Sequence, residues 1–554
     1  MTGVRIAIAQ INSIVGDLKG NTEKILLYIS QAKAKEADMV VFPELALTGY
    51  PPEDLVLKPH FVKENIKYIN KIAKSIKDII AIVGFIDADN KGIYNSAGIL
   101  ADKKVNRVYH KICLPNYGVF DEKRYFTPGL KKDVVKAKGF SFSVDICEDI
   151  WVSETKAQKK VVSSAQFLVN ISASPYHIDK AKERRAILTK KAKAFKKPIV
   201  YCNLVGGQDE LVFDGRSAVF SKDGTLLAGA SPFEEDLVTF DLELDIKRSV
   251  RKKAIAKPSP LKKMSKEEEV YSALVLGVRD YVRKNNFRKV NLGISGGIDS
   301  ALVALVAVDA LGPTNVLAVS MPSRYSSKGT QDDAEKISRN LGIRFVKIPI
   351  DDVFDSYLNT LSSHFTGMES DITEENIQAR VRGNILMAFS NKFGYLVLNT
   401  GNKSEASVGY CTLYGDMAGG FAVLKDVPKD LVYKLVRYVN ERENNNIVPE
   451  TIIKRSPSAE LSPGQKDQDT LPSYALLDKI IDLHIEKRES FKNIVKKLGN
   501  KPVVEGVLKM IKANEYKRRQ APPGIKITPL AFGRDRRMPI TNKFTEAGYE
   551  RHDK

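Results

Sequence analysis

The sequence predicts an α/β protein of two domains, and three features support this prediction. Short apolar runs typical of strands alternate with amphipathic runs typical of helices from the first residues to near Asp241. A second such series begins near Lys266. Between them, residues 246–265 are basic, with two prolines and few large apolar side chains, which indicates a linker. We therefore expect one domain over residues 1–245 and another over residues 266–554.

The order of the runs refines this prediction. In the first domain we expect helices near residues 21–34 and 63–76, and the strand-like runs are VRIAIAQI, DMVVFPE, IIAIVGFI, FSFSVDIC, FLVNIS and PIVYCN. The second domain opens with a helix, and helical segments then separate VNLGISGGIDS, NVLAVSMPS, IRFVKIPI and YLVLNTGN. That series is typical of a Rossmann-like, doubly wound parallel sheet, which binds ligands at the carboxyl ends of its strands. The tail after Leu461 is rich in Pro, Asp and Lys, so we expect it to cover the active site more than to build core.

Composition excludes several classes of protein. The chain has 554 residues, and its start lacks the basic-then-apolar pattern of a signal peptide. No uninterrupted apolar run reaches the roughly 18 residues of a membrane span, so we expect a cytoplasmic protein with no membrane partner. Four cysteines without a CxxC pair argue against disulfide, zinc-ribbon and iron–sulfur frameworks, and leave only single-thiol chemistry.

The net charge of +20 is spread along the chain. No zinc finger, RNP-like aromatic motif or Gly-x-x-Gly clamp accompanies the charge, so we expect small anionic substrates and no nucleic acid.

The stretch GISGGIDS lies between a strand-like run and the helix-like run ALVALVAVDALG. Adjacent glycines let the backbone approach an anion, serine hydroxyls add donors, and the following helix directs its positive end to the same place. We therefore predict a phosphate-binding loop. The loop lacks the lysine of a Walker A motif, so the bond attacked need not be the β–γ bond. Its residues are Gly293, Ile294, Ser295, Gly296, Gly297, Ile298, Asp299 and Ser300.

The motif SGGxDS resembles the pyrophosphate loop of the N-type ATP pyrophosphatases. Members of that superfamily split ATP into AMP and pyrophosphate and activate a carboxylate or carbonyl as an adenylate. The resemblance thus implies an adenylating second domain.

In the first domain, three reactive side chains lie just beyond apolar runs: Glu44, Lys111 and Cys147. A thiol becomes a nucleophile when a base removes its proton and a cation stabilises the charge that develops. A carboxylate and an ammonium group can supply those two roles. Cys113 and Cys202 are competing thiols, but one lies two residues from Lys111 and the other lies inside a strand-like run. We therefore expect Cys147 to be the nucleophile.

Over residues 4–240 these motifs resemble the nitrilase superfamily, whose Glu-Lys-Cys triad hydrolyses amides through a thioester on an αββα sandwich. The resemblance implies that Cys147 attacks a carboxamide, that Glu44 is the general base and acid, and that Lys111 stabilises the oxyanion. Glu122 matches a further glutamate beside the triad, with a surface ion pair as the alternative, and we assign it no role. Positions that hold glutamine in one branch of the family match Tyr117, Glu148, Ser174 and Lys180.

An ammonia source joined to an adenylating loop implies an amidotransferase. ENIQARVRGNILM, NTGNKSEASVGYCTLYGDMAGGFAVLKDVPK, RSPSAEL and YKRRQAPPGIKITPLAFGRDRRMP resemble the glutamine-dependent NAD+ synthetase family over residues 266–540. That family converts deamido-NAD to NAD+ with ATP, Mg2+ and glutamine, through an adenylate of the nicotinate carboxylate.

For the second site, the carboxylates of Asp299 and Glu405 suit Mg2+ shared with a triphosphate. Thr400 follows the strand-like YLVLN, where the backbone can approach ATP. Met321 either lines the adenine pocket or is a core methionine. Family positions that touch deamido-NAD match Asn376, Glu405, Asp416 and Lys517.

The alternative function is another ATP-pyrophosphatase amidotransferase, which acts on a different carboxylate or carbonyl. A GMP-synthetase-like enzyme would need a Cys-His-Glu glutaminase, and a tRNA-thiolating enzyme would need paired cysteines; neither is evident. An inactive nucleotide-binding scaffold would have lost at least one residue of the set Glu44, Lys111, Cys147, Asp299 and Glu405, and all five are present. We further expect a homo-oligomer.

Overall fold

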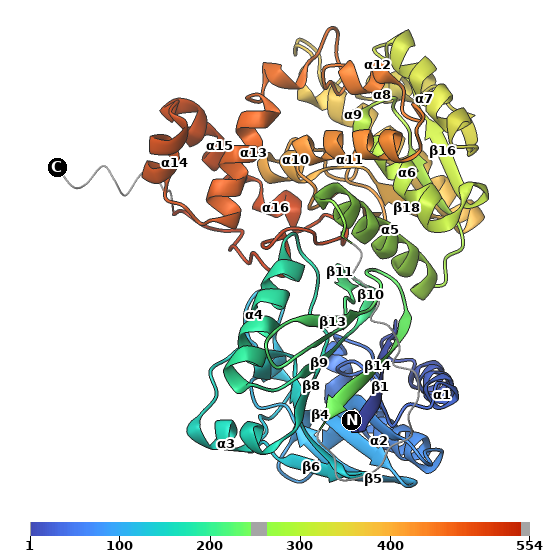
Figure 1. Ribbon diagram of the computed structural model, residues 1–554. Helices are drawn as coiled ribbons and strands as arrows, with labels where there is room; N and C mark the ends of the chain where they lie inside the picture. The colour runs from blue at the N-terminus through green and yellow to red at the C-terminus, as the bar shows by residue number, and fades with distance from the viewer. Residues whose placement is uncertain (1, 245–262, 545–554) are drawn as a thin grey trace, which may run out of the picture. The chain divides into compact units, whose positions relative to one another are not determined.

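The computed structural model describes residues 2–244 and 263–544 (Figure 1). The chain divides into two compact units, Met1–Met264 and Ser265–Lys554. The predicted linker, residues 246–265, lies outside the described residues except for its last three, and the expected boundaries at 245 and 266 stay predictions. Within the described residues, none of the helices combines the length and the apolar composition that crossing a membrane requires.

The first unit contains two six-stranded sheets that face one another. The first sheet has the order β14-β1-β2-β3-β4-β5, and the second has the order β13-β12-β9-β8-β7-β6. The strands of the first sheet are β1 (Thr2–Gln10), β2 (Met39–Val41), β3 (Ile80–Ala88), β4 (Ile93–Ala101), β5 (Lys104–His110) and β14 (Asp236–Leu244). Those of the second are β6 (Val134–Ala137), β7 (Phe140–Ile146), β8 (Phe167–Ser172), β9 (Ile199–Asn203), β12 (Ala218–Phe220) and β13 (Leu226–Gly229). A separate hairpin pairs β10 (Val205–Gln208) with β11 (Leu211–Asp214).

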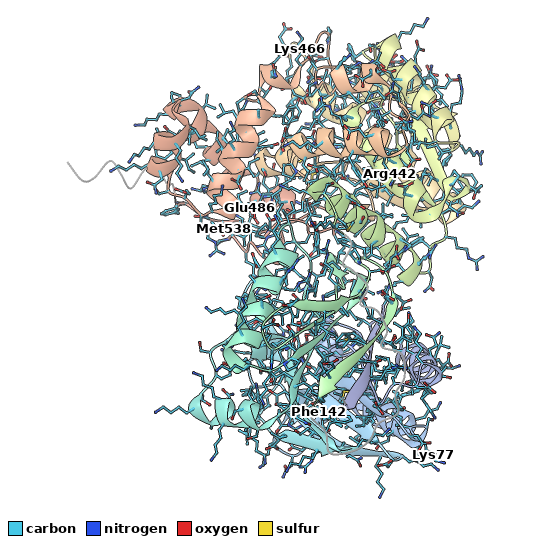
Figure 2. The ribbon with its side chains drawn as sticks, viewed as in Figure 1. Lys77, Phe142, Arg442, Lys466, Glu486 and Met538 are labelled. Carbon is cyan, nitrogen blue, oxygen red and sulfur yellow. The ribbon has the colours of Figure 1, made fainter. Side chains whose placement is uncertain are left out.

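Alternating side chains divide the first unit into layers. On β1, Ile6 and Ile8 pack between the two sheets, together with Phe142 of β7, which Figure 2 labels. Ala7 and Ala9 point the other way, toward the helices α1 (Leu18–Ala34) and α2 (Pro59–Lys74). Behind the second sheet, another core cluster joins the helices α3 (Lys156–Ser164) and α4 (Lys180–Phe195) to β8, β9 and β12. The predicted αββα sandwich is therefore confirmed.

The second unit is built on a five-stranded parallel sheet with the order β17-β16-β15-β18-β19. The strands are β15 (Val290–Gly293), β16 (Val316–Ser320), β17 (Arg344–Lys347), β18 (Leu396–Asn399) and β19 (Phe421–Ala422). The chain moves outward from β15 to β17 and then returns to the other side of β15 with β18. The loops that follow β15 and β18 thus flank the point where the strand order reverses, where such sheets bind ligands.

Helices cover both faces of this sheet, as the prediction of a doubly wound fold requires (Figure 1). The helices α8 and α9 pack on β16 through Leu317, Val319 and Phe354, whereas α5, α6 and α11 pack together on the opposite face. The bounds of the helices from α5 to α11 are α5 (Lys266–Lys284), α6 (Ile298–Leu311), α7 (Lys328–Asn340), α8 (Asp351–Leu361), α9 (Ile372–Phe393), α10 (Lys403–Val408) and α11 (Lys429–Arg442). The helix that was expected to open near Lys266 begins at that residue, capped by Ser265.

The expectation for the tail is wrong in part. The short α12 (Glu450–Lys454) precedes the tail, of which Asp467, Arg518, Ala521 and Pro522 line the cavity of this unit, but other segments of the tail build a core of their own. That core includes Leu477, Ile494 and Val507 from three further helices, α13 (Tyr474–Ile481), α14 (Phe491–Leu498) and α15 (Lys501–Ala513), which α16 (Glu515–Arg518) follows. Glu486, labelled in Figure 2, accepts a hydrogen bond from the buried Lys403 of α10 and ties this core to the rest of the unit. These helices carry many charged residues on their exposed surfaces, so the composition of the tail did not indicate their apolar faces.

We predict that Gly84→Ala destabilises the first unit by about 1–3 kcal/mol, the usual cost of overpacking. A Cβ atom at Gly84 on β3 would lie 2.3 Å from the backbone nitrogen of Leu45 and the backbone oxygen of Pro43, which flank Glu44. Thermal unfolding measures the loss. The control is Gly98→Ala on β4, where the nearest atom, at 3.2 Å, belongs to the side chain of Phe85 and can move. Equal losses in the two variants would contradict the prediction.

Candidate active sites

The ends of three strands place the three reactive side chains of the first unit. Glu44 follows β2 by three residues, Lys111 comes directly after β5, and Cys147 comes directly after β7. Cys147 has a positive φ of 43°, in the left-handed region that a side chain adopts at a cost in energy. Its sharp turn begins the short helix η3 (Cys147–Ile150).

Glu44 is fully buried, and its carboxylate is held at both oxygens. Oε1 accepts hydrogen bonds from Nζ of Lys111 and from Nδ2 of Asn95, both at 2.7 Å, and Oε2 accepts the backbone N–H of Ala173 at 2.8 Å. Each carboxylate oxygen has two lone pairs, so Oε2 keeps one for a proton. Glu44 is therefore oriented to act as a base.

Lys111 lies between two carboxylates. Its Nζ donates to Oε1 of Glu44 at 2.7 Å and to Oε1 of Glu122 at 2.8 Å, and its side chain has no solvent exposure. Burial alone lowers the pKa of Lys111, but the charges of Glu122 and Glu44 raise it well above its ordinary value. The ammonium group has three N–H donors, so one remains beyond these two bonds.

Glu122 belongs to this buried cluster and forms no surface ion pair. It is 4% exposed, and Oε1 also accepts the hydroxyl of Tyr50 at 2.9 Å. Burial and the charge of Glu44 raise the pKa of Glu122 to about 7, while Lys111 lowers it. Its place in sequence predicted only an acidic residue near the triad.

The thiol of Cys147 is neutral at rest. Burial and the charge of Glu44 raise its pKa well above the ordinary value, and Lys111 lowers it only in part. Both side chains thus act electrostatically on the sulfur, and loss of the proton must accompany attack. The competing Cys202 is fully buried between the sheets, with its sulfur near the carbonyl oxygens of Ala9 and Val41.

Of the four residues expected at the glutamine end, Glu148 follows Cys147 directly, Tyr117 and Lys180 contact residues just after Cys147, and Ser174 follows Ala173, which contacts Glu44. The hydroxyl of Tyr117 donates to Oε2 of Glu148 at 2.9 Å. Nζ of Lys180 lies 4.4 Å from the centre of the Trp151 ring and donates to Glu183. Ser174 is buried, and its backbone N–H donates to Asn203.

A cavity of about 380 Å³ follows the carboxyl ends of β15 and β18 in the second unit. Gly296 has a positive φ of 79°, and a Cβ atom there would lie 2.0 Å from the backbone oxygen of Thr330, so only glycine fits. Ser295 closes the loop by accepting the N–H of Gly297 at 3.2 Å. The cavity wall contains all eight residues of the predicted phosphate loop together with Met321, Thr400, Glu405 and Asp416.

The two carboxylates predicted to hold a metal ion share one ammonium group. Nζ of Lys429 donates to Oδ2 of Asp299 and, at 3.4 Å, to Oε1 of Glu405. Burial and the charge of Asp299 raise the pKa of Glu405 to about 7, and the charge of Lys429 lowers it. No group of three or more His, Cys, Asp or Glu side chains suited to a metal occurs in the described parts of the chain, so any ion here would need further oxygens from a substrate.

Two residues expected at the deamido-NAD site are absent from the cavity wall within residues 263–544: Asn376 and Lys517. Both residues instead form hydrogen bonds to residues 411 and 412, at or next to the cavity wall. Oδ1 of Asn376 accepts the hydroxyl of Thr412 at 2.7 Å, while Oδ1 of Asp416 accepts the N–H of Thr412 at 2.8 Å. Nζ of Lys517 donates to the carbonyl oxygen of Cys411, a wall residue, at 2.7 Å.

Sequence reasoning missed several residues of these sites. Asn95 lies within a strand. Lys429 and Arg455 lie in motifs that indicated only the resemblance to the family and no role for either residue. Arg455 donates to the carbonyl oxygen of Gly296 at 3.1 Å and pairs with Asp333, so it holds the phosphate loop. No local pattern marks these positions, because their partners lie far away along the chain.

Comparison with known proteins agrees with this geometry. Residues 5–252 match the carbon-nitrogen hydrolase family, and residues 270–521 match the NAD synthase family. The fold and the two sites thus define a carbon-nitrogen hydrolase joined to an NAD synthase in one chain.

The relatives are similar over their whole length. Glutamine-dependent NAD(+) synthetase of Thermotoga maritima is 47% identical over 99% of this chain and 100% of its own length. The enzyme of that name from Aquifex aeolicus is 46% identical over 98% of this chain and 100% of its own. The chain belongs to the glutamine-dependent NAD(+) synthetase family, as the resemblance predicted. The solved structure of the Acinetobacter baumannii synthetase in complex with ADP has a TM-score of 0.78 at 41% identity, and covers 98% of this chain and 100% of its own.

We predict that Arg455→Ala raises the KM for ATP by about tenfold or more, because the phosphate loop loses one charge-assisted hydrogen bond worth about 1.5–3 kcal/mol. The measurement is the rate of NAD+ formation from ammonium salts at varied ATP. Lys454→Ala is the matched control, since Lys454 is exposed and pairs with Glu450 on its own helix. An unchanged KM for ATP in Arg455→Ala would show that this contact does not support the loop.

Proposed function

We propose that the chain makes NAD+ from deamido-NAD, with ATP as the activating substrate and glutamine as the nitrogen donor. The first unit releases ammonia from glutamine, and the second unit activates the nicotinate carboxylate and amidates it. The observation that carries this proposal is the buried cluster of Glu44, Lys111 and Cys147 in a chain that also holds a phosphate loop without a Walker lysine.

In the first unit, the sulfur of Cys147 attacks the side-chain carboxamide carbon of glutamine while Glu44 takes the thiol proton. The negative charge that forms on the carboxamide oxygen is stabilised by the remaining N–H donor of Lys111. Glu44 then returns the proton to the departing nitrogen, which leaves as ammonia. Water, deprotonated by Glu44, then attacks the thioester carbon; the bond to sulfur breaks, the sulfur takes the proton back from Glu44, and glutamate is released.

Glutamine is distinguished from simpler amides by its amino-acid end. We propose that Tyr117, Glu148, Ser174 and Lys180 hold that end. Glu148 supplies a negative charge for the α-ammonium group, and Lys180 supplies a positive charge for the α-carboxylate. The hydrogen bond from Tyr117 to Glu148 supports this assignment, because it orients the carboxylate beside the nucleophile.

In the second unit, the nicotinate carboxylate attacks the α-phosphorus of ATP and pyrophosphate leaves; ammonia then displaces AMP. We propose that residues 293–300 bind the phosphates, that Thr400 contacts ATP, and that Asn376, Glu405, Asp416 and Lys517 form or support the deamido-NAD site. Lys429, which pairs with Asp299 and Glu405, brings a positive charge to the same wall of the cavity.

Magnesium fits this wall. Asp299 and Glu405 offer hard carboxylate oxygens that already share one cation, and Mg2+ typically binds one or two carboxylates together with substrate phosphates. When bound, the ion would neutralise charge on the triphosphate. A cytoplasmic location and a homo-oligomer also stay predictions.

We predict that Cys147→Ala abolishes NAD+ synthesis from glutamine but leaves synthesis from ammonium salts within about twofold, because only nitrogen delivery depends on the thiol. Both rates are measured on the same preparation. Ser163→Ala, at an exposed hydroxyl of the same unit, is the control and should keep both activities. Loss of both activities in Cys147→Ala would refute the proposed division of labour.

We predict that Asp299→Asn stops synthesis from both nitrogen sources, because it removes one carboxylate charge from the proposed metal and ATP site. Synthesis from glutamine and from ammonium is compared with that of Asp332→Asn, a change at an exposed carboxylate of the same unit. Retained turnover with ammonium in Asp299→Asn would rule out the proposed role of this carboxylate.

A further inference from the structure

One buried carboxylate of the first unit has no part in the proposed chemistry but touches both halves of its site. Asp149 is 4% exposed and lies in η3, two residues after Cys147. Oδ1 accepts the backbone N–H groups of Ile112, at 3.1 Å, and Cys113, at 2.7 Å. Oδ2 accepts the backbone N–H of Ile146, at 3.0 Å, and the hydroxyl of Tyr109, at 2.8 Å.

These four donors come from two segments that carry the reacting groups. Tyr109, Ile112 and Cys113 flank Lys111, and Ile146 directly precedes Cys147. The first segment includes the end of β5 of the first sheet and the residues just after it, and the second is the end of β7 of the second sheet. A single carboxylate thus joins the end of the strand that carries the cation to the end of the strand that carries the nucleophile.

The bond to Ile146 also closes the turn at the nucleophile. Cys147 has a φ of 43°, which the chain adopts only where its surroundings hold it. The hydrogen bond from the backbone N–H of Ile146 to the side chain of Asp149 spans Cys147, because one partner precedes Cys147 and the other follows it. This bond therefore restrains the conformation of Cys147.

We propose that Asp149 is the positioning residue of the glutaminase site, a brace that sets the distance and direction between Lys111 and the sulfur of Cys147. The inference rests on the proposed glutaminase function of this unit. Asp149 acts through the backbone of its neighbours and does not touch the substrate. An ionised carboxylate accepts all four hydrogen bonds, whereas a proton on Oδ1 would face backbone N–H groups and a proton on Oδ2 would require the hydroxyl of Tyr109 to turn round and accept it.

The protonation of Asp149 therefore matters for activity. Burial and then the charge of Asp145 raise its pKa to about 6, against hydrogen bonds from Cys113, Ile146 and Tyr109, which lower it. The other titratable groups around it are the thiol of Cys113 and the ammonium group of Lys132, which pairs with Asp145. Below about pH 6 the brace should open, and glutamine hydrolysis should fall.

The first test is Asp149→Asn in the full chain, assayed with glutamine and, separately, with ammonium salts. An amide nitrogen placed against backbone donors breaks part of the brace, and a misplacement of about 1 Å at a reacting group can cost about 100-fold in rate. We expect kcat with glutamine to fall by about 100-fold with KM for glutamine within about threefold, and the rate with ammonium to stay within about twofold. Asp133→Asn, at an exposed carboxylate of the same unit, should change neither rate.

The second test is the pH profile of Tyr109→Phe, which removes one hydrogen bond that lowers the pKa of Asp149. The acid limb of glutamine hydrolysis should therefore move to higher pH, with little loss at its maximum. An unmoved acid limb, a loss of less than about tenfold in Asp149→Asn, or an equal loss with glutamine and ammonium would each overturn the inference. Failure of the unaltered protein to release ammonia from glutamine would instead refute the proposed function.

Discussion

The first unit is organised around one ammonium group that water does not reach. Lys111 lies between Glu44 and Glu122 with no solvent exposure, and removal of one partner from a buried ion pair costs about 3–5 kcal/mol. Because the three side chains come from separate segments, their ion pairs fix where those segments end. In the low-polarity interior of the sandwich, Lys111 forms ion pairs with both Glu44 and Glu122. We propose that its third N–H donor faces the substrate. Fold and proposed chemistry thus depend on the same cluster.

The second unit repeats this arrangement for a different purpose. Lys429 pairs with Asp299 and Glu405 near the carboxyl ends of the parallel strands. Lys403, which is buried two residues before Glu405, pairs with Asp426 and Glu486. The wall carboxylates of Asp299 and Glu405 are held by Lys429 and also by Asn402, which donates a hydrogen bond to each of them. In the first unit we propose that the carboxylate of Glu44 accepts a proton from the sulfur of Cys147, whose pKa burial and the charge of Glu44 raise. In the second unit we propose that the carboxylates face phosphate and metal, and a bound cation would favour their ionised forms.

Much of this could be predicted from sequence, because both sites lie at strand ends and strand ends are visible in hydrophobic patterning. Glu44, Cys147 and the loop from Gly293 to Ser300 lie at the ends of apolar runs that the structure forms as strands, whereas Lys111 follows β5, whose sequence KVNRVYH is mostly polar. Asp149 and Lys429 could not be found this way. Three of the four donors that hold Asp149, on Tyr109, Ile112 and Cys113, lie more than thirty residues away, and Lys429 meets Asp299 across 130 positions of chain. The tail was misjudged because its charged residues conceal three amphipathic helices.

We propose that one polypeptide takes nitrogen from an amide by sulfur chemistry and transfers it to a carboxylate activated as an adenylate. The most direct measurement supplies the protein with ATP, Mg2+, deamido-NAD and glutamine labelled with nitrogen-15 in its amide, without added ammonium, and follows label and products together. The account predicts nitrogen-15 in the carboxamide of NAD+, with AMP, pyrophosphate and glutamate formed in step with it. Unlabelled NAD+, or ADP and phosphate in place of AMP and pyrophosphate, would contradict it.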